Sequence, residues 1–364
     1  MMNQIQTPRI TNDNLMDSVS EIRFGNNDIF ATGAWDGYIR FYQILTQSGI
    51  QTQIALDFKS AIDCQEPVLS VSWKRDMTMI FAALADNTVR VYDVRTGQNI
   101  ILGYHDDSPA RQVFWNEDLQ VLVSLGLDKK LKLWSLKQNT MGMKPQPVYE
   151  LNLTSIPTVG EQDQNERMFV YADIDCKVKW FSWDKIRGNL NSNVSRNIFE
   201  VEDSKLGNRS QISTLSISHN SKQMGYCSID GRGAVMEMSD RLEANNRIVY
   251  KCHKREEDSK TSFKPEKINT YYVVNSLQFN SRSYDWVSTS ASDCSIIFWD
   301  LKKKNKITTI QYDAPVIASQ ISPDGYFLAY ATGYDWGQGL DGIDNRFHNN
   351  VGAIFIEKQQ LFYV

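Results

Sequence analysis

The sequence predicts an all-β protein, a single seven-bladed β-propeller, because one pattern recurs six times along it. In each copy, two short β-prone runs flank a polar turn with an aspartate, and an apolar residue follows that aspartate by six residues. The turn aspartates are 50, 42, 47, 55 and 63 residues apart. Internal periods of about 40 to 50 residues are typical of four-stranded propeller blades. The six pairs are Asp36 with Tyr42, Asp86 with Tyr92, Asp128 with Trp134, Asp175 with Phe181, Asp230 with Met236, and Asp293 with Trp299.

The chain length fits one closed domain. At about 50 residues a blade, the 364 residues hold seven blades and little else, so we expect a single domain over residues 1–364. A hydrophobic content of 41% with 11% aromatic residues supplies a large core. The net charge of −4 argues against a protein that coats nucleic acid with its whole surface, although it permits a local basic patch.

The β-prone segments can be assigned to blades in chain order. The first three blades are expected at residues 20–24, 29–33, 38–44 and 52–58; 69–73, 79–83, 89–94 and 99–104; and 111–115, 121–125, 131–136 and 148–153. Blades four and five are expected at 156–159, 168–172, 178–183 and 197–201, and at 212–217, 223–227, 233–238 and 248–252. Blade six follows at 274–279, 286–290, 295–299 and 306–311, and blade seven at 317–321, 327–331 and 352–357.

Three segments lie outside this regular pattern. Residues 1–18 form an N-terminal arm, and a strand within residues 4–10 is expected to close the last blade, which would otherwise leave an open sheet edge. Residues 253–269 are polar without periodicity and predict a solvated loop between blades five and six. Residues 333–350, rich in Gly, Asp and Asn, replace the tight hairpin of blade seven, and long loops in compact domains are often functional.

No arrangement of residues in the sequence points to catalysis. The four histidines have no metal-ligand spacing, and no phosphate loop or nucleophile motif is present. Asp in a tight turn bonds nearby backbone amides, so the repeated aspartates are interpreted as structural. We therefore expect no enzyme, no cofactor and no metal site, with a propeller enzyme as the rival from another class.

The remaining composition suggests a soluble protein of a reducing compartment. The five cysteines are scattered and form no C-x-x-C pair, which favours free thiols over disulfides or zinc ligands. The first residues lack the features of a secretory signal, and there is no apolar run of about 18 residues. We expect an intracellular protein without membrane insertion.

Two local features suggest binding surfaces. Four of the five residues from 302 to 306 are lysines, which is either an ordinary solvated turn or a patch for an acidic peptide or a phosphate backbone. Tyr334 and Trp336 are aromatic residues in an otherwise polar insertion. Such residues either contact a ligand or fold back onto blade seven, and the sequence leaves both readings open.

Four segments resemble a known family: residues 33–37 (GAWDG), 104–109 (YHDDSP), 250–253 (YKCH) and 331–339 (ATGYDWGQG). The resemblance is to the WD40 proteins that include the nuclear-pore poly(A)-RNA export factor and the related mitotic-checkpoint adaptor. It covers the whole chain, and the last segment is similar to the export branch. It implies a non-catalytic adaptor that captures a short helical segment, the GLEBS motif, of a nucleoporin.

The resemblance also implies particular contact residues. The partner-peptide site would comprise Arg232, Tyr250 and Lys251, with the arginine meeting glutamates of the motif. A basic side groove for single-stranded RNA would comprise Tyr250, Trp299, Lys302, Lys304 and Lys306, where an aromatic ring flanked by lysines suits base stacking and phosphate neutralisation.

The expected function is therefore that of an mRNA export adaptor. It would be a monomer within a heteromeric complex in the nucleus, at the nuclear pore and envelope, with shuttling to the cytoplasm. One alternative is a spindle-checkpoint adaptor that binds checkpoint kinases. Another is a scaffold in a different complex, in which case the basic groove would be incidental.

Overall fold

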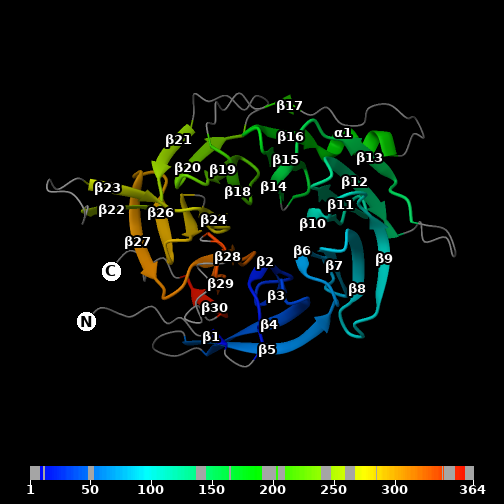
Figure 1. The fold of residues 1–364 in the computed structure, drawn as a ribbon, viewed down its shortest axis with the longest axis horizontal. Coiled ribbons are helices and arrows are strands. Elements are labelled where there is room, and N and C mark those ends of the chain that lie inside the picture. The colour runs from blue at the N-terminus through cyan, green and yellow to red at the C-terminus, as the bar shows by residue number, and fades with distance from the viewer. Residues whose placement is uncertain are drawn as a thin grey trace.

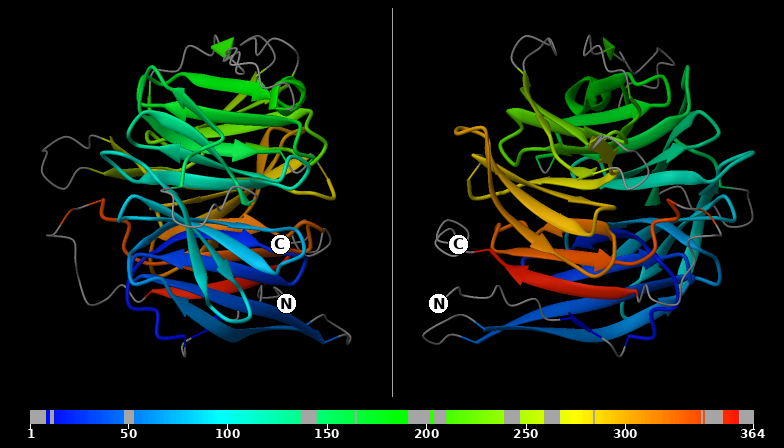
Figure 2. Two further views of the ribbon diagram at one scale, coloured as in Figure 1. Left: turned by 90° about the vertical axis from the view of Figure 1, so that its right-hand side faces the viewer. Right: turned by 60° about the vertical axis from the view of Figure 1, so that its left-hand side comes forward.

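The computed structural model confirms a seven-bladed β-propeller (Figure 1). It describes residues 9–10, 13–47, 53–136, 145–163, 165–190, 202–203, 210–238, 247–258, 267–283, 285–337, 339 and 349–356. Seven four-stranded antiparallel sheets stand around a central axis. The edge-on views show that their strands run between the two faces of the ring (Figure 2).

The strands of the first four blades follow the predicted order. Blade one has β2 (Val19–Phe24), β3 (Ile29–Ala34), β4 (Tyr38–Gln47) and β5 (Gln53–Asp63). Blade two has β6 (Val68–Trp73), β7 (Met79–Leu84), β8 (Thr88–Asp93) and β9 (Asn99–Tyr104). Blade three has β10 (Ala110–Asn116), β11 (Val121–Gly126), β12 (Lys130–Ser135) and β13 (Tyr149–Asn152). Blade four has β14 (Pro157–Gln162), β15 (Met168–Asp173), β16 (Val178–Ser182) and β17 (Glu202–Asp203).

The last three blades complete the ring. Blade five has β18 (Ile212–Ile217), β19 (Gln223–Ser228), β20 (Arg232–Glu237) and β21 (Arg247–Lys251). Blade six has β24 (Val274–Phe279), β25 (Trp286–Ala291), β26 (Ser295–Asp300) and β27 (Asn305–Gln311). Blade seven has β28 (Val316–Ile321), β29 (Phe327–Thr332), β30 (Asn350–Phe355) and β1 (Arg9–Ile10), which pairs antiparallel with β30. The rest of the expected closing strand, residues 4–8, lies outside the described residues.

Apolar side chains between the blades hold the ring together. The first strand of every blade lines the centre and contacts the first strand of the next, and β28 meets β2 to complete the circle (Figure 1). Each of seven buried hydrophobic clusters joins two neighbouring blades, as where Phe30 and Tyr42 of blade one pack with Phe327 of blade seven. Burial of this apolar surface is the main favourable contribution to folding.

The turns between second and third strands all lie on one face of the ring, because the second strands of all blades run in the same direction. This face carries the turn aspartates and is called the aspartate face below. Residues 13–18 of the N-terminal arm run along it at blade one, where the Arg40 Nη2 donates to the Asn14 carbonyl at 2.8 Å. The Tyr42 hydroxyl donates to Asp13 Oδ2 at 2.7 Å.

Two segments differ from the prediction. Residues 183–190 form a helix, α1 (Trp183–Leu190), although residue 183 was expected to end a strand. Trp183 and Ile186 lie one turn apart on this helix and are both buried against blades three and four. The expected fourth strand at 197–201 lies outside the described residues.

Residues 253–269, expected to form a polar, solvated loop between blades five and six, contain strands at both ends. β22 (Lys254–Asp258) and β23 (Lys267–Tyr271) pair as a two-stranded antiparallel sheet that projects from the ring (Figure 1). One ion pair crosses between the strands, from Glu256 to Lys267 at 3.7 Å, and Glu256 also contacts Lys254 of its own strand at 2.5 Å. Residues 333–337, 339 and 349–350 are described within the insertion expected at 333–350, and β30 begins at its last residue.

Candidate partner-binding surfaces

The turn aspartates of blades one and two stabilise their own hairpins. Asp36 accepts two hydrogen bonds from the Arg40 guanidinium, at 2.9 and 2.7 Å, and both side chains are almost fully buried. Asp86 pairs with Arg90 in the same i,i+4 arrangement. Bidentate pairs of this kind fix the geometry of a turn. The structural interpretation of these aspartates is confirmed.

Blade four uses a different aspartate from the one predicted. Asp173 is fully buried, pairs with Lys179 Nζ at 3.0 Å and accepts the backbone N–H of Asp175. Asp173 rather than Asp175 thus holds this turn, so the six-residue spacing to Phe181 identified the hairpin but not its stabilising carboxylate.

Blade three contains a buried four-residue network. His105 Nδ1 lies 2.9 Å from both carboxylate oxygens of Asp128, and His105 Nε2 lies 2.7 Å from the Ser124 hydroxyl. Trp134 Nε1 donates to the same hydroxyl at 2.8 Å. The contacts are all satisfied if the histidine carries its proton on Nδ1 and accepts from Ser124 at Nε2.

Blade six repeats this network with threonine in place of serine. His253 Nδ1 lies 2.9 Å from Asp293, and His253 Nε2 lies 2.9 Å from the Thr289 hydroxyl, which accepts Trp299 Nε1 at 2.9 Å. Both histidines were left without a role in the sequence analysis. His105 contacts an aspartate 23 residues later and His253 one 40 residues later. Separations of this length hide both pairs from a search for short motifs.

The networks stabilise the charged form of both turn carboxylates. Burial by itself would raise the pKa of Asp293, but hydrogen bonds from His253 and Ser295 hold the pKa below its ordinary value. The pKa of Asp128 is likewise lowered, with His105 outweighing the effect of burial.

Trp299 is unusual among the six repeated apolar positions because it is only partly buried. The other five are at most 2% exposed: Tyr42, Tyr92, Trp134, Phe181 and Met236. The Trp299 ring stacks on Tyr250 of blade five, with centroids 5.3 Å apart and planes 30° apart. The rings therefore cover each other instead of presenting two open faces, and the Tyr250 hydroxyl is buried.

The lysines of the predicted groove divide into two groups. Lys306 is the cross-strand partner of Trp299 and is exposed, so the structure brings it to the stacked rings. Lys302 lies in the turn between β26 and β27 and pairs with Asp285 at 2.8 Å. Lys304, in the same turn, adopts a positive φ of 55° and is exposed. The turn is on the face opposite the aspartate face.

Arg232 and Lys251 lie on the aspartate face of blade five. They are cross-strand partners and both are exposed. Arg232 Nε contacts Asp230 Oδ2 at 3.1 Å, which offsets part of the repulsion between the two cations. The turn requires Gly231, because its φ is +70° and a Cβ there would lie 2.7 Å from the His253 carbonyl oxygen.

Tyr334 and Trp336 differ in their surroundings. The Tyr334 hydroxyl donates to the Gly339 carbonyl at 2.6 Å, and the Tyr334 carbonyl accepts the Ser18 hydroxyl at 2.9 Å. These bonds tie the Tyr334 side chain to its own insertion and its backbone to the N-terminal arm, and a ligand contact by Tyr334 stays a prediction. Trp336 is 50% exposed, with its ring centroid 5.5 Å from that of Tyr334.

These two residues stand at the mouth of a cavity of about 460 Å³, which opens on the aspartate face and is called the central cavity. Its walls include residues that sequence reasoning missed, above all Trp35 and Arg111. A signal for Trp35 was present, because it directly precedes a turn aspartate. The N–H of that position bonds back to the preceding loop in blades one to six, at Trp35, Ala85, Leu127, Ile174, Ile229 and Ser292.

Three of these residues form an exposed apolar series: Trp35 is 48% exposed, Ile174 48% and Ile229 44%. With Trp336 they give the aspartate face several large apolar side chains around its centre. Exposed apolar groups gathered on one face are typical of a protein-binding surface.

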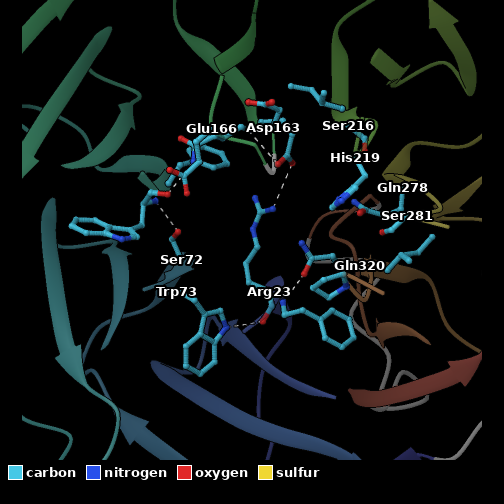
Figure 3. Close-up of a pocket in the computed structure, with 18 of the residues that line it drawn as sticks. Arg23, Ser72, Trp73, Asp163, Glu166, Ser216, His219, Gln278, Ser281 and Gln320 are labelled. Atoms are coloured by element: carbon cyan, nitrogen blue, oxygen red, sulfur yellow. Dashed lines mark hydrogen bonds and ion pairs between the residues drawn. The ribbon is translucent and has the colours of Figure 1, made fainter. Parts of the chain in front are cut away.

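A second cavity, of about 280 Å³, opens on the opposite face and is shown in Figure 3. Arg23 projects into its middle, where it pairs with Glu21 at 2.8 Å and with Glu161 at 3.5 Å. The guanidinium also lies over the Phe114 ring, 5.3 Å from its centroid. Because this arginine links blades one and four across the centre, we assign it a structural role.

The described residues give no indication of metal or redox chemistry. No group of three or more His, Cys, Asp or Glu side chains in this part of the chain could hold a metal ion. All five cysteines are free thiols, with Cys64, Cys227 and Cys252 buried. Among the described helices, none has the length and apolar character needed to cross a bilayer.

Comparison with known proteins agrees with this geometry. Residues 58–93 match the family model described as WD domain, G-beta repeat. The chain is a seven-bladed β-propeller with a WD40 repeat at residues 58–93. No catalytic family is indicated by this match or by the names of the relatives.

The relatives confirm the resemblance to the export-factor family. The chain is 28% identical to the Poly(A)+ RNA export protein of Schizosaccharomyces pombe over 92% of this chain and 86% of that protein. It is 26% identical to the mRNA export factor rae-1 of Caenorhabditis elegans, over 90% and 82%. Mitotic checkpoint protein bub3 of Dictyostelium discoideum is 23% identical over 89% of this chain and 88% of its own length.

Proposed function

We propose that this propeller is a non-catalytic adaptor in mRNA export that binds a GLEBS-like helical segment of a nucleoporin on its aspartate face. Its relatives are named as export factors, which supports a role in that process. Such an adaptor would act in the nucleus and at the nuclear pore, as one subunit of a heteromeric complex.

The observation that carries the partner assignment is the juxtaposition of Arg232 and Lys251. Two exposed cations face each other across one strand pair, next to the exposed Ile229. An amphipathic segment with glutamates beside apolar residues is complementary to this arrangement. Asp230 offsets only part of the repulsion between the two cations, so an acidic partner segment would be favoured here.

RNA contact is a second, separate part of the proposal. Trp299 and Lys306 lie together on the outer wall, and Lys304 adds charge at the adjacent turn. Because Tyr250 and Trp299 cover each other's faces, a base would stack on the outer edge of this pair or contact it after a ring moves. Phosphate neutralisation by lysines would supply most of the affinity.

The alternative function is that of a spindle-checkpoint adaptor that binds checkpoint kinases. The similarity to Mitotic checkpoint protein bub3 favours it, although at lower identity than the export relatives. Both functions would use the aspartate face, so the partner distinguishes them.

Affinity purification from nuclei tests the proposal. The wild-type protein should recover a nucleoporin with a GLEBS-like segment, and Arg232→Glu and Lys251→Glu should each lose it while melting at an unchanged temperature. Lys222→Glu, an exposed charge reversal at the other end of blade five, is the matched control and should retain the partner. Recovery of checkpoint kinases alone, or equal recovery by all variants, would contradict the assignment.

A further inference from the structure

Arg111 occupies an unusual position at the start of β10. It lines both the central cavity and a narrower space of about 100 Å³ directly below it, so its side chain lies inside the channel. Its guanidinium makes no hydrogen bond or ion pair with any residue that the structure describes. It is partly exposed and borders both cavities.

The carboxylate that partly compensates the charge of Arg111 is already engaged by other groups. Glu21 is the carboxylate whose field acts on Arg111, but one Glu21 oxygen accepts Arg23 Nε at 3.0 Å. The other accepts the Ser70 hydroxyl at 2.6 Å and the Val71 N–H at 2.8 Å. Desolvation lowers the pKa of Arg111, and Glu21 offsets only part of it. A guanidinium in this state gains more from an anion than an exposed one does.

The rim of the cavity indicates which anion fits. Its lining includes several apolar side chains: Trp35, Ala85, Pro109, Leu127 and Trp336. The carboxylate on the rim, Asp335, accepts the N–H of Gly337 at 3.1 Å. A single cation below an apolar rim suits one carboxylate between apolar neighbours, whereas a nucleic acid carries a charge on every phosphate.

We propose that the central cavity is a binding subsite for an acidic side chain of a partner peptide, with Arg111 pairing its carboxylate and the apolar rim holding the flanking residues. The subsite is separate from the Arg232 and Lys251 pair. It deepens the proposed function and rests on it in one respect, namely that a partner segment crosses the aspartate face.

Nuclear magnetic resonance titration tests the subsite with short probes. Acetyl-Leu-Glu-Leu-amide and its glutamine counterpart are added to the full-length protein, and the indole N–H signals of Trp35 and Trp336 are followed. The glutamate peptide should bind about tenfold tighter, as expected for one charge-assisted bidentate contact. The preference should vanish in Arg111→Gln, while Arg75→Gln, on the opposite face, should keep it.

Three results would overturn the subsite. They are an equal or undetectable response of the wild type to both peptides, a preference that survives in Arg111→Gln, and tighter, Arg111-dependent binding of a short oligouridylate. Arg111→Met serves if the glutamine variant does not fold. If the wild type shows no preference for the glutamate peptide but Arg232→Glu still loses the nucleoporin, only the proposed subsite is refuted. If the preference holds and Arg232→Glu retains the nucleoporin, the proposed function falls instead.

Discussion

Blades three and six contain the same histidine network, yet only in blade six does its tryptophan reach the surface. Trp134 is 2% exposed, whereas Trp299 is partly exposed. The hydrogen-bond distances from histidine to aspartate and from tryptophan to hydroxyl agree within 0.1 Å. The difference therefore arises outside the network.

One residue on the preceding blade explains it. In blade two, Gly103 is the cross-strand partner of Val89, and in blade five Tyr250 is the cross-strand partner of Gly233. Gly103 and Tyr250 therefore occupy equivalent positions in the two blades. A Cβ on Gly103 would lie 1.9 Å from the Trp134 ring, so the ring fills the space that a side chain would need. In blade six that space contains the Tyr250 ring, and Gly233 provides room for it, with a Cβ there 2.6 Å from the ring.

The same hydrogen-bond network thus occurs with a covered tryptophan in blade three and with a partly exposed one in blade six. The network fixes the indole nitrogen in both blades, and the neighbouring blade decides whether the ring is covered. Trp299 is held rigidly enough to present a defined surface, which reduces the ordering cost of binding.

The largest expected effect is the difference between two tryptophan truncations. Trp134→Ala should lower the free energy of unfolding by about 3–5 kcal/mol, as for large buried aromatic residues. Trp299→Ala should cost about half as much or less, because part of the ring already contacts water. Urea denaturation of both variants measures the difference. An equal loss in the free energy of unfolding would show that the partial exposure of Trp299 does not reduce its contribution to stability.

The glycine position gives the next largest effect. Gly103→Ala should destabilise the protein by about 1–3 kcal/mol through overpacking against Trp134. Tyr250→Phe removes only a buried hydroxyl without a described partner and should leave stability within about 0.5 kcal/mol. Thermal melts compare the two, and a harmless Gly103→Ala would refute the account of why Trp134 is buried.

Acid should weaken both networks. The pKa of Asp128 is lower in the folded state than its ordinary value of 3.8, so the unfolded chain binds protons first as the pH falls. The contribution of Asp128 to folding stability is complete above the ordinary pKa of 3.8 and is lost as the pH drops through the lower pKa of the folded state. Urea midpoints should therefore fall below about pH 4, and Asp128→Asn should make this decline shallower. An unchanged pH dependence in that variant would remove Asp128 from the explanation.

The smallest expected effect concerns RNA. Lys304→Glu with Lys306→Glu should weaken binding of single-stranded RNA and reduce its salt dependence by about 0.7 for each lost phosphate contact. Lys302 is a poorer choice because Asp285 already pairs with it. Filter binding across salt concentrations, with Lys222→Glu as control, measures the slope. Equal slopes would leave the blade-six surface without a role in RNA binding.

The sequence predicted the blades well because the information is local. Each hairpin has its own turn and its own alternating strands, and the six-residue spacing marks an inward-facing position in five of six copies. Helix α1 was missed because Trp183 extends a β-prone run, and its burial depends on contacts with another blade. The β22–β23 pair was missed because β22 consists entirely of charged residues and the apolar residues of β23, Ile268 and Tyr271, are exposed and mark no core-facing side.

The candidate sites were less predictable because they depend on contacts between blades. The lysine run and the Arg232 turn were visible in the sequence, but the stacking of Tyr250 on Trp299 was not. The unpaired state of Arg111 is a property of the folded channel, since nothing in its local sequence distinguishes it from Arg23. The position directly before a turn aspartate is exposed in three of the six blades, at Trp35, Ile174 and Ile229, and partly buried in the other three, so the position alone does not predict exposure.

The central claim is that the aspartate face binds the export partner, and site-specific photo-cross-linking tests it most directly. A benzoylphenylalanine replaces Ile229 on that face or Ile100 on the outer strand of blade two, which are 44% and 53% exposed. On irradiation in nuclear extract, position 229 should cross-link to a nucleoporin and position 100 should not. Cross-linking of the nucleoporin at position 100 alone, or at neither position, would contradict the claim.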